Sequence, residues 1–294
     1  MTKDFLKTLG LAAAFAVSLA GAAAAEVDTV RLAKQFGISY LPLTVMEEEK
    51  LLEKHAKDLG LDVKTEWLRF TGGSGMNEAL LSGNLDFASG GVGPMLTIWG
   101  RTQKSIGVKG VATLNAMPLY LVSVNPNVKT IKDFTDKDKI ALPTVKTSIQ
   151  AVTLQMAAEK TFGEGQQNKL DPLTVSMGHP DAQVAMMGGR SEINAHFGSS
   201  PFQDLELKDP RAHKVLDSYD VLGGPHTFNL VWTTTKFAES NPKVMKAFLA
   251  AQWTTTPQKM MTYLDYMNRA GLVTAKAKDW RDLFFAPIHN ASGS

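Results

Sequence analysis

The sequence has no cysteine. Disulfide bonds are therefore excluded, and with them a small disulfide-stapled scaffold, a thiolate metal site and a lipid-modified cysteine. An excess of charge is also lacking, because 31 basic and 29 acidic residues leave a formal net charge of +2. Such a near-neutral chain gives no electrostatic reason to bind nucleic acid or an anionic membrane surface. With 294 residues the chain is long enough for two domains.

The N-terminal segment has the pattern of a secretory signal peptide. Lys3 and Lys7 form a short basic region, residues 9–19 are apolar, and Ala23–Ala25 is a small-residue cleavage motif. The alternative is a membrane anchor, but the uncharged stretch is at the short limit for a membrane span and no basic stop-transfer cluster follows it. We therefore expect a signal peptide over residues 1–25, cleavage after about Ala25, and a location in a bacterial periplasm.

Next come three strand–turn–helix units. Alternating apolar residues predict the strands, and proline, glycine and serine residues mark the turns and helix ends. Ser74 is the expected N-cap of the second helix. Units of this kind predict a parallel sheet whose ligand edge lies at the carboxyl ends of the strands. The expected strands are residues 29–36, 62–70 and 85–89. The first two expected helices are residues 42–59 and 75–82, and a third follows the second glycine turn and runs through Trp99.

The second half again alternates strands and helices, and two long extended stretches, residues 111–124 and 214–235, flank it. Two extended crossings predict that the chain enters a second domain and then returns, so that C-terminal helices near 241–254 and 257–270 pack on the first. Further expected helices are residues 130–134, 149–162 and 181–188, and further expected strands are residues 139–143, 173–177 and 192–197.

Two glycine-rich turns, Gly72–Gly75 and Gly90–Gly93, each open an expected helix. A glycine turn at a helix N-terminus exposes backbone N–H groups at the positive end of the helix dipole, where an anion can bind. The turns lack the lysine of a phosphate loop and the spacing of a dinucleotide motif. Either they are simple tight turns, or together they form one wall of a small-ligand site.

The stretch "FTGGSGMNEALLSGNLDFASGGVGPMLTIWG", residues 70–100, resembles the substrate-binding proteins of ABC importers in the nitrate/sulfonate/taurine group. The resemblance continues through most of residues 29–285. It rests on the order of short segments, namely Glu78–Leu80, Gly83, Asp86–Phe87, Gly91 with Pro94, Ile131–Phe134, Asp181–Ala182 and Gly198–Pro201.

This resemblance implies an α/β chain with a two-lobed periplasmic binding protein fold of type II. Each lobe is then a mostly parallel sheet flanked by helices, two extended crossings join the lobes, and the lobes close on a ligand by hinge motion. The implied division is residues 26–116 for the first part of lobe 1, 117–222 for lobe 2, and 223–294 for the return and C-terminal helices of lobe 1.

The resemblance also implies which residues contact the ligand. In two places the sequence departs from the usual pattern: "TVKTSI" at residues 144–149 and "DFTDKDK" at residues 133–139. The anion contacts at the first of these are therefore expected to differ. The implied contacts are Ser39, Tyr40, Gly73, Ser74, Gly90, Gly91, Thr147, Ser148, Ser199 and Ser200.

Some further side chains allow two interpretations. Asn115 and His226 lie in the two crossings, and His226 either contacts the ligand or packs within a strand. Tyr40 either meets the ligand or covers the sheet edge. Strand alternation turns only one of His196 and Phe197 inward. The six histidines lack metal-binding spacing, so neither a metal site nor a cofactor is expected.

The sequence as a whole predicts a monomeric, non-enzymatic solute-binding protein that delivers a small anion to an ABC permease. The anion would be a sulfonate, taurine, nitrate or a related molecule. One alternative is a carrier of an aromatic acid or a pyrimidine, and a more remote one is an exported α/β hydrolase or transferase. The remote alternative lacks a G-x-S-x-G elbow and a histidine–acid pattern.

Overall fold

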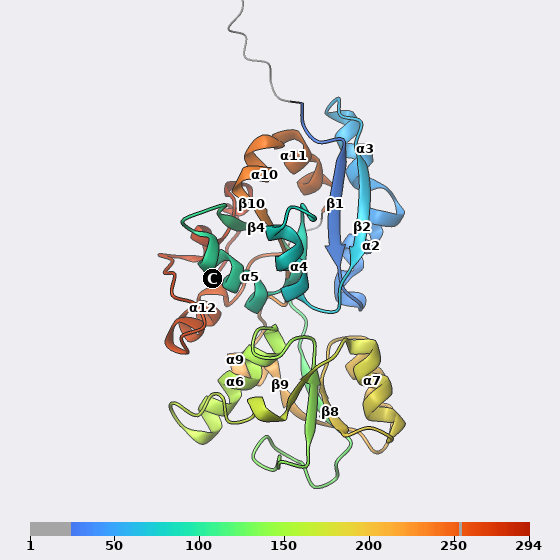
Figure 1. The fold of residues 1–294 in the computed structure, drawn as a ribbon, viewed down its shortest axis with the longest axis vertical. Coiled ribbons are helices and arrows are strands. Elements are labelled where there is room, and N and C mark those ends of the chain that lie inside the picture. The colour runs from blue at the N-terminus through green and yellow to red at the C-terminus, as the bar shows by residue number, and fades with distance from the viewer. Residues whose placement is uncertain (1–24, 253–254) are drawn as a thin grey trace, which may run out of the picture.

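The computed structural model describes residues 25–252 and 255–294. Two lobes lie one above the other along the long axis of the molecule (Figure 1). We call the body built on β1–β4 and β10 lobe 1, and the body built on β5–β9 lobe 2. All of the predicted signal peptide except Ala25 lies outside the described residues. Within the described part of the chain, no helix combines the length and the apolar character that a membrane crossing requires.

Lobe 1 has two groups of strands. β1 and β2 pair in parallel, and β10 pairs antiparallel with both β3 and β4. A parallel bridge between Leu32 and Phe87 connects the two groups. The strands are β1 (Thr29–Lys34), β2 (Lys64–Arg69), β3 (Ala88–Gly91), β4 (Val108–Thr113) and β10 (Asn229–Thr234).

Helices cover these strands, and the C-terminal helix α11 packs on α3 at the top of lobe 1. Phe87 stacks on Phe248 of α11 with ring centroids 4.5 Å apart, which ties the C-terminal part of the chain to the first strands. The helices are η1 (Ile38–Tyr40), α2 (Leu41–Glu48), α3 (Leu51–Asp58), α4 (Gly73–Leu81), α5 (Val92–Thr102), α10 (Thr235–Ser240), α11 (Pro242–Ala251), α12 (Met260–Arg269), η3 (Trp280–Leu283) and η4 (Ala286–Ile288).

Lobe 2 is one five-stranded sheet in the order β7-β6-β8-β5-β9, with helices on its faces. The strands are β5 (Tyr120–Ser123), β6 (Lys139–Leu142), β7 (Thr174–Ser176), β8 (Ile193–Phe197) and β9 (His213–Asp217). The helices are α6 (Ile149–Phe162), η2 (Asp171–Leu173), α7 (His179–Gly188), α8 (Phe202–Glu206) and α9 (Ser218–Leu222).

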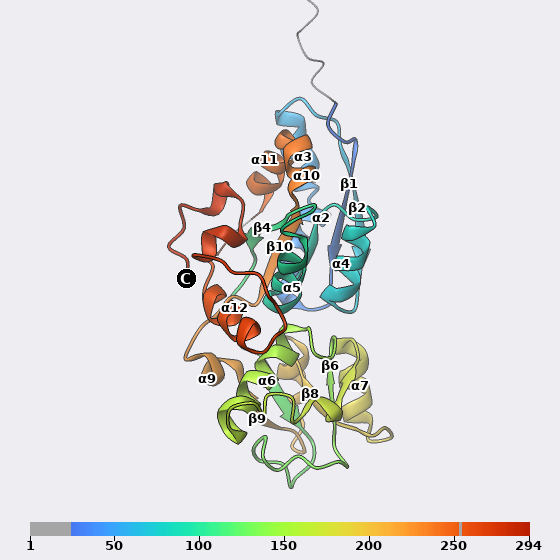
Figure 2. The same cartoon turned by 60° about the vertical axis from the view of Figure 1, so that its left-hand side comes forward.

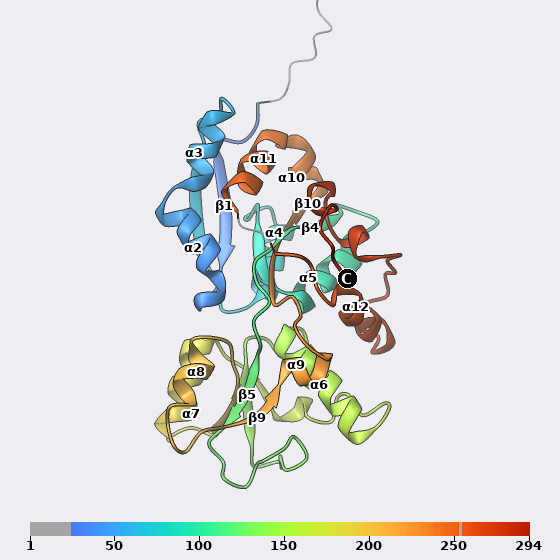
Figure 3. The same cartoon turned by 180° about the vertical axis from the view of Figure 1, so that it is seen from behind.

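The two crossings run side by side between the lobes (Figure 3). Strand direction depends on them. Strands reached through a helix within one lobe pair in parallel, as β6 does with β7 and β8. β5 and β10 enter from the opposite lobe and therefore run antiparallel to their neighbours. Lobe 2 is thus a mixed sheet with a parallel part, and lobe 1 combines a parallel pair of strands with an antiparallel group of three.

Four local expectations were wrong, and for the first three a local contact or backbone conformation accounts for the difference. The helix expected over residues 42–59 is two helices, because Lys50 adopts a left-handed conformation with φ of 51°. Residues 130–134 form a turn, since the Asp133 carboxylate accepts the N–H groups of Lys129 and Thr130. The second crossing contains the short helix α9, which Asp217 caps by accepting the Tyr219 N–H. Ser74 does not cap α4; the N-cap is Gly72.

The C-terminal segment also reaches lobe 2. α12 lies beside α5 and extends toward α6 and α9 (Figure 2). The Tyr263 hydroxyl on α12 is 3.4 Å from Thr153 Oγ1 on α6. Residues 253 and 254, at the end of the expected helix 241–254, lie outside the described residues.

Candidate functional site

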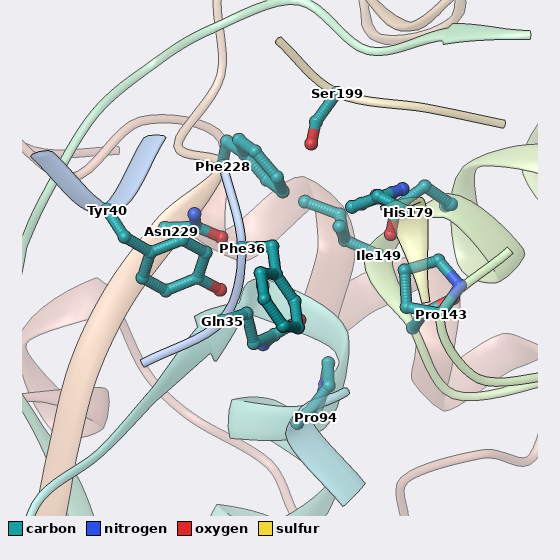
Figure 4. Close-up of a pocket in the computed structure, with 14 residues that line it drawn as sticks. Gln35, Phe36, Tyr40, Pro94, Pro143, Ile149, His179, Ser199, Phe228 and Asn229 are labelled. Carbon is teal, nitrogen blue, oxygen red and sulfur yellow. The ribbon is translucent and has the colours of Figure 1, made fainter. Parts of the chain in front are cut away.

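A pocket lies between the two lobes where the strand ends and helix starts of both meet. It is a small, partly enclosed space. In Figure 4 the hydroxyl groups of Tyr40 and Ser199 point toward the space between the labelled side chains. The lining residues are Gln35, Phe36, Tyr40, Gly73, Gly91 and Pro94 of lobe 1, Pro143, Ser148, Ile149, Gln150, His179 and Ser199 of lobe 2, and Phe228 and Asn229 of the returning crossing.

Four helices begin at this pocket. Gly73 is the first residue of α4, Gly91 is the N-cap of α5, Ser148 is the N-cap of α6, and His179 is the first residue of α7. The first N–H groups of a helix have no partner within the helix, and the helix dipole makes that end positive. Two helices from each lobe therefore direct positive potential into one small space.

Two buried side chains at the pocket have unpartnered polar atoms. Ser199 is 1% exposed and Asn229 is fully buried. The Ser199 hydroxyl and both polar atoms of the Asn229 amide have no hydrogen-bond partner. Buried polar groups are nearly always hydrogen-bonded, so a group of three such atoms around a pocket indicates a ligand that supplies the partners.

The other lining side chains are aromatic or neutral. Phe36 and Phe228 give the pocket two apolar walls. Tyr40 is 3% exposed, and burial raises the pKa of its phenol, so the hydroxyl keeps its proton and can donate it in a hydrogen bond. Among the residues that the structure describes, no lysine or arginine lines the pocket. The Arg69 guanidinium lies outside it, 5.1 Å from the Phe36 ring centroid.

Of the histidines in the described ranges 25–252 and 255–294, His179 is the one that lines the pocket. Its ring stacks on Phe202 with centroids 5.7 Å apart. Burial first, and the charge of His196 second, hold the pKa of His179 well below its ordinary value of 6.5. The ring is therefore neutral at physiological pH and presents either a hydrogen-bond donor or an acceptor. In the described part of the chain, no three His, Cys, Asp or Glu residues gather in a way that could hold a metal ion.

The lobes also approach each other closely beside the pocket, at glycines of lobe 1. A Cβ atom placed on Gly91 would lie 2.6 Å from Ile149 Cγ2, and one placed on Gly93 would lie 2.5 Å from the Thr147 carbonyl oxygen. Contact also continues through side chains, since Ser74 Oγ and Thr147 Oγ1 are 2.9 Å apart. The glycines of the second turn therefore give lobe 2 the room to close against lobe 1.

Five of the sequence-predicted contacts line the pocket, and they come from both lobes. These five are Tyr40, Gly73, Gly91, Ser148 and Ser199.

The remaining seven predicted contacts do not line it. Ser74 and Thr147 hydrogen-bond to each other between the lobes, and Gly90 packs against the side chains of Gln35 and Trp232. The Ser200 carbonyl accepts the Ile38 N–H.

Three of these seven lie farther away. Asn115 Nδ2 donates to the Ser39 carbonyl at 2.6 Å, and both residues line a separate apolar groove. His226 is fully buried, and its Nε2 is 2.8 Å from Ser218 Oγ. His196 and Phe197, at the end of β8, both have buried side chains. Phe197 is part of the main apolar core, and His196 hydrogen-bonds to His179.

Several lining residues were missed by the sequence reasoning. Gln35 and Phe36 follow β1, at the edge where the parallel-sheet rule places ligands, so that rule could have found them. His179 is the first residue of α7, directly before Pro180, and a proline in the first helical turn could have indicated this helix start. Asn229 had no local signal. The missed residues are Gln35, Phe36, Pro94, Pro143, Ile149, Gln150, His179, Phe228 and Asn229.

No protein-family model and no curated protein sequence matches the chain. Solved structures match it at low identity. The alkanesulfonate-binding protein SsuA from Xanthomonas axonopodis pv. citri, bound to MOPS, aligns with a TM-score of 0.61 at 18% identity over 85% of this chain and 78% of that chain. The aliphatic sulphonate-binding protein SsuA from Escherichia coli aligns with a TM-score of 0.56 at 20% identity over 84% and 75%.

The periplasmic nitrate-binding protein NrtA from Synechocystis PCC 6803 aligns with a TM-score of 0.56 at 15% identity, over 88% of this chain and 69% of that chain. The predicted α/β, two-lobed periplasmic binding protein fold is therefore confirmed. The structural neighbours are sulfonate- and nitrate-binding proteins of the predicted type, and this chain shares their fold.

Proposed function

We propose that this protein is an extracytoplasmic solute-binding protein that captures a small anion between its lobes and delivers it to an ABC permease. The observation that carries the proposal is the convergence of four helix N-termini on a pocket where the Ser199 hydroxyl and the Asn229 amide lack partners. Helix N-termini and neutral donors bind an anion without a basic side chain.

A sulfonate, nitrate or a similar small oxyanion fits this site best. The pocket is small, and its donors are short hydroxyls, amides and backbone N–H groups. Two of the neighbours are named for sulfonate binding and one for nitrate binding, which supports this ligand class. They do not favour the alternative of an aromatic acid or a pyrimidine. Phe36 and Phe228 would contact the apolar part of an organic anion.

The pocket side chains support ligand binding and not catalysis. Ser148 Oγ accepts the Ala151 N–H as a helix cap, and Ser199 Oγ has no base beside it. A hydrolase or transferase would need a nucleophile within reach of a base. The structural neighbours are binding proteins of transport systems. We therefore propose a non-enzyme.

We place the mature protein in the periplasm as a monomer, after cleavage near Ala25. Residues 26–116 and 223–294 form the lobe that begins and ends the chain, and residues 117–222 form the other. The crossings between them, after Thr113 and after Leu222, act as the hinge about which the lobes open for release to the permease.

A thermal-shift titration tests the function. Purified protein is heated with methanesulfonate, taurine, nitrate, bicarbonate, aromatic acids and pyrimidines in turn. An anion present at 100 times its Kd should stabilise the folded protein by about 2.7 kcal/mol and raise Tm accordingly. Turnover of chromogenic esters with no shift from any anion would show that the binding role is wrong.

The variant Ser199→Ala tests the site. Loss of a hydrogen bond to a charged ligand costs about 1.5–3 kcal/mol, so the affinity for the anion should fall at least about tenfold. Ser240→Ala is the matched control, because Ser240 is an exposed serine at the end of α10. Equal affinities of the two variants would contradict the assignment of the pocket.

A further inference from the structure

A chain of three side chains connects the pocket to a buried carboxylate. His179 Nδ1 is 2.8 Å from His196 Nε2, and His196 Nδ1 is 2.6 Å from Glu206 Oε1. At the pocket end, His179 Nε2 is 3.4 Å from the Gln150 amide nitrogen. We call His179, His196 and Glu206 the relay. It begins at the pocket lining and ends in the interior of lobe 2.

Few neighbouring groups stabilise the negative charge of the Glu206 carboxylate at the inner end of the relay. The side chains of His196 and Glu206 are both 0% exposed. The second carboxylate oxygen, Glu206 Oε2, is buried without a partner. An ionised carboxyl group in such a place favours a positive charge beside it, and His196 is the group in position to carry one.

Other charged groups on the surrounding elements lie away from the relay. Asp181 on α7 and Asp204 on α8 are exposed. Lys139 on β6 and Tyr120 on β5 are only half-buried, and Lys214 covers the Tyr120 ring at 4.5 Å. On α6 the neighbour is the neutral amide of Gln150, and Glu159 and Lys160 lie in the last turns of that helix. The ionisable groups in direct contact within the relay are therefore its own three members.

The protons of the relay can be arranged in two ways without any movement of its nitrogen and oxygen atoms. In the first, His196 Nδ1–H donates to Glu206, His179 Nδ1–H donates to His196 Nε2, and His179 Nε2 accepts a hydrogen bond from Gln150. In the second, one added proton arrives at His179 Nε2 and the Nδ1 proton of His179 passes to His196 Nε2. His196 is then a cation beside the Glu206 anion, and His179 is still neutral.

The two arrangements differ at the pocket. The first has a net charge of one negative unit and presents an acceptor at His179 Nε2. The second has no net charge and presents a donor there, next to the donating Gln150 amide. An oxyanion needs donors and is repelled by negative charge, so it binds the second arrangement more tightly.

We propose that the pocket takes up its anion together with one proton, which the relay stores as the His196–Glu206 ion pair while His179 becomes a donor to the ligand. This inference rests on the proposed anion-binding function. It assigns His179 and Gln150 as a pair of donors that select for an anion. The low pKa of His179 is consistent with it, because the added charge resides on His196 and not on the ring that lines the pocket.

Isothermal titration calorimetry measures the proton directly. Methanesulfonate and nitrate, which remain fully ionised, are titrated into the protein in buffers of different ionisation enthalpy from about pH 6 to about pH 9. Uptake should rise from near zero toward one proton per anion as the pH rises. Over the range where uptake is complete, the affinity should fall about tenfold per pH unit, because one proton is linked to binding.

Two variants and one spectrum complete the test. Glu206→Gln should remove the uptake and make the affinity nearly independent of pH. His55→Gln, which changes a partly exposed histidine on α3, should leave both unchanged. If Glu206→Gln does not fold, ¹⁵N-histidine NMR of the unaltered protein still reports the protons. Addition of the anion should then protonate both nitrogens of one ring and move the proton of a second ring from Nδ1 to Nε2.

Failure of the relay proposal and failure of the anion-binding function give different results. An anion that binds with no proton uptake at any pH, and with unchanged histidine spectra, would overturn the relay proposal and leave the binding function intact. Absence of binding by every anion at every pH would overturn both, since the relay proposal depends on an anionic ligand.

Discussion

Asn229 lies at the start of β10, where the returning crossing enters lobe 1 beside Gly91 of β3. Its backbone is satisfied, because its carbonyl accepts the Leu114 N–H. Its side-chain amide is buried with neither polar atom bonded. Leaving a buried polar group unpaired costs about 1–3 kcal/mol. A residue that destabilises the ligand-free fold in this way, at the pocket, is explained by the partners that a ligand supplies.

The variant Asn229→Leu should therefore separate stability from binding. Leucine has a similar size and no polar atoms, so the free energy of unfolding without ligand should rise by about 1 kcal/mol or more. The anion-induced rise in Tm should be lost. Urea denaturation and thermal-shift titration measure the two quantities.

Asn125→Leu is the matched control in lobe 2. Asn125 donates to Asp138 and accepts the Asn127 N–H, so its amide is satisfied. This change should lower the free energy of unfolding and leave anion binding intact. A loss of stability in Asn229→Leu comparable to that of Asn125→Leu would contradict the role given to Asn229.

Among the elements, α5 has two tasks. Its N-terminus contributes to the positive field at the pocket, and its first turn contacts lobe 2 through glycines too small to obstruct closure. Gly93 does not line the pocket, so its contact with the Thr147 carbonyl concerns the fit of the lobes and not the ligand.

The variant Gly93→Ala should hold the lobes apart. A methyl group there meets the Thr147 carbonyl at 2.5 Å, so the affinity for the anion should fall at least about tenfold, equivalent to about 1.4 kcal/mol. The helix itself should gain up to about 1 kcal/mol from alanine. Calorimetric titration and thermal unfolding measure the two effects.

Gly188→Ala provides the comparison, because Gly188 is also helical and a Cβ there meets nothing within 4 Å. Its affinity for the anion should stay unchanged. If Gly93→Ala bound the anion as tightly as Gly188→Ala, the close approach of the lobes would not be required for binding.

For the whole molecule, the two lobes are held together beyond the pocket by buried groups of the C-terminal segment. The Tyr263 hydroxyl lies 3.4 Å from Thr153 of lobe 2 and 3.4 Å from His226 of the crossing. Tyr263 is fully buried, and burial raises the pKa of its phenol, as it does for Tyr40. Both tyrosines are therefore neutral in the folded protein well above their ordinary pKa of 10.0.

Stability should consequently fall in alkaline solution. Above about pH 10 the unfolded chain loses its tyrosine protons while the folded protein keeps them, so unfolding is favoured as the pH rises. Each buried tyrosine contributes at most about 1.4 kcal/mol per pH unit. Urea denaturation at a series of pH values should show a shallower decline for Tyr263→Phe. Identical slopes for Tyr263→Phe and the unaltered protein would exclude this cause.

The sequence determined those features of the fold that depend on near neighbours. Alternating apolar residues and glycine turns specified strands and helix starts, and thus the N-termini of α4 and α5 at a common edge. The local errors have local causes as well, such as the left-handed Lys50 and the capping by Asp133. The overall two-lobed fold followed from the order of these units together with the resemblance to known binding proteins.

Only the tertiary structure decided how distant segments meet. The pairing of Asn229 with Gly91 places an amide at the pocket that no pattern around residue 229 indicates. The relay joins the start of α7, the end of β8 and the end of α8. Such contacts arise when whole faces of sheets and helices are buried, and the free energy of that burial is a sum over many residues. Local periodicity shows which face of an element is buried, and only the packed core fixes which side chains then lie within hydrogen-bond distance of each other.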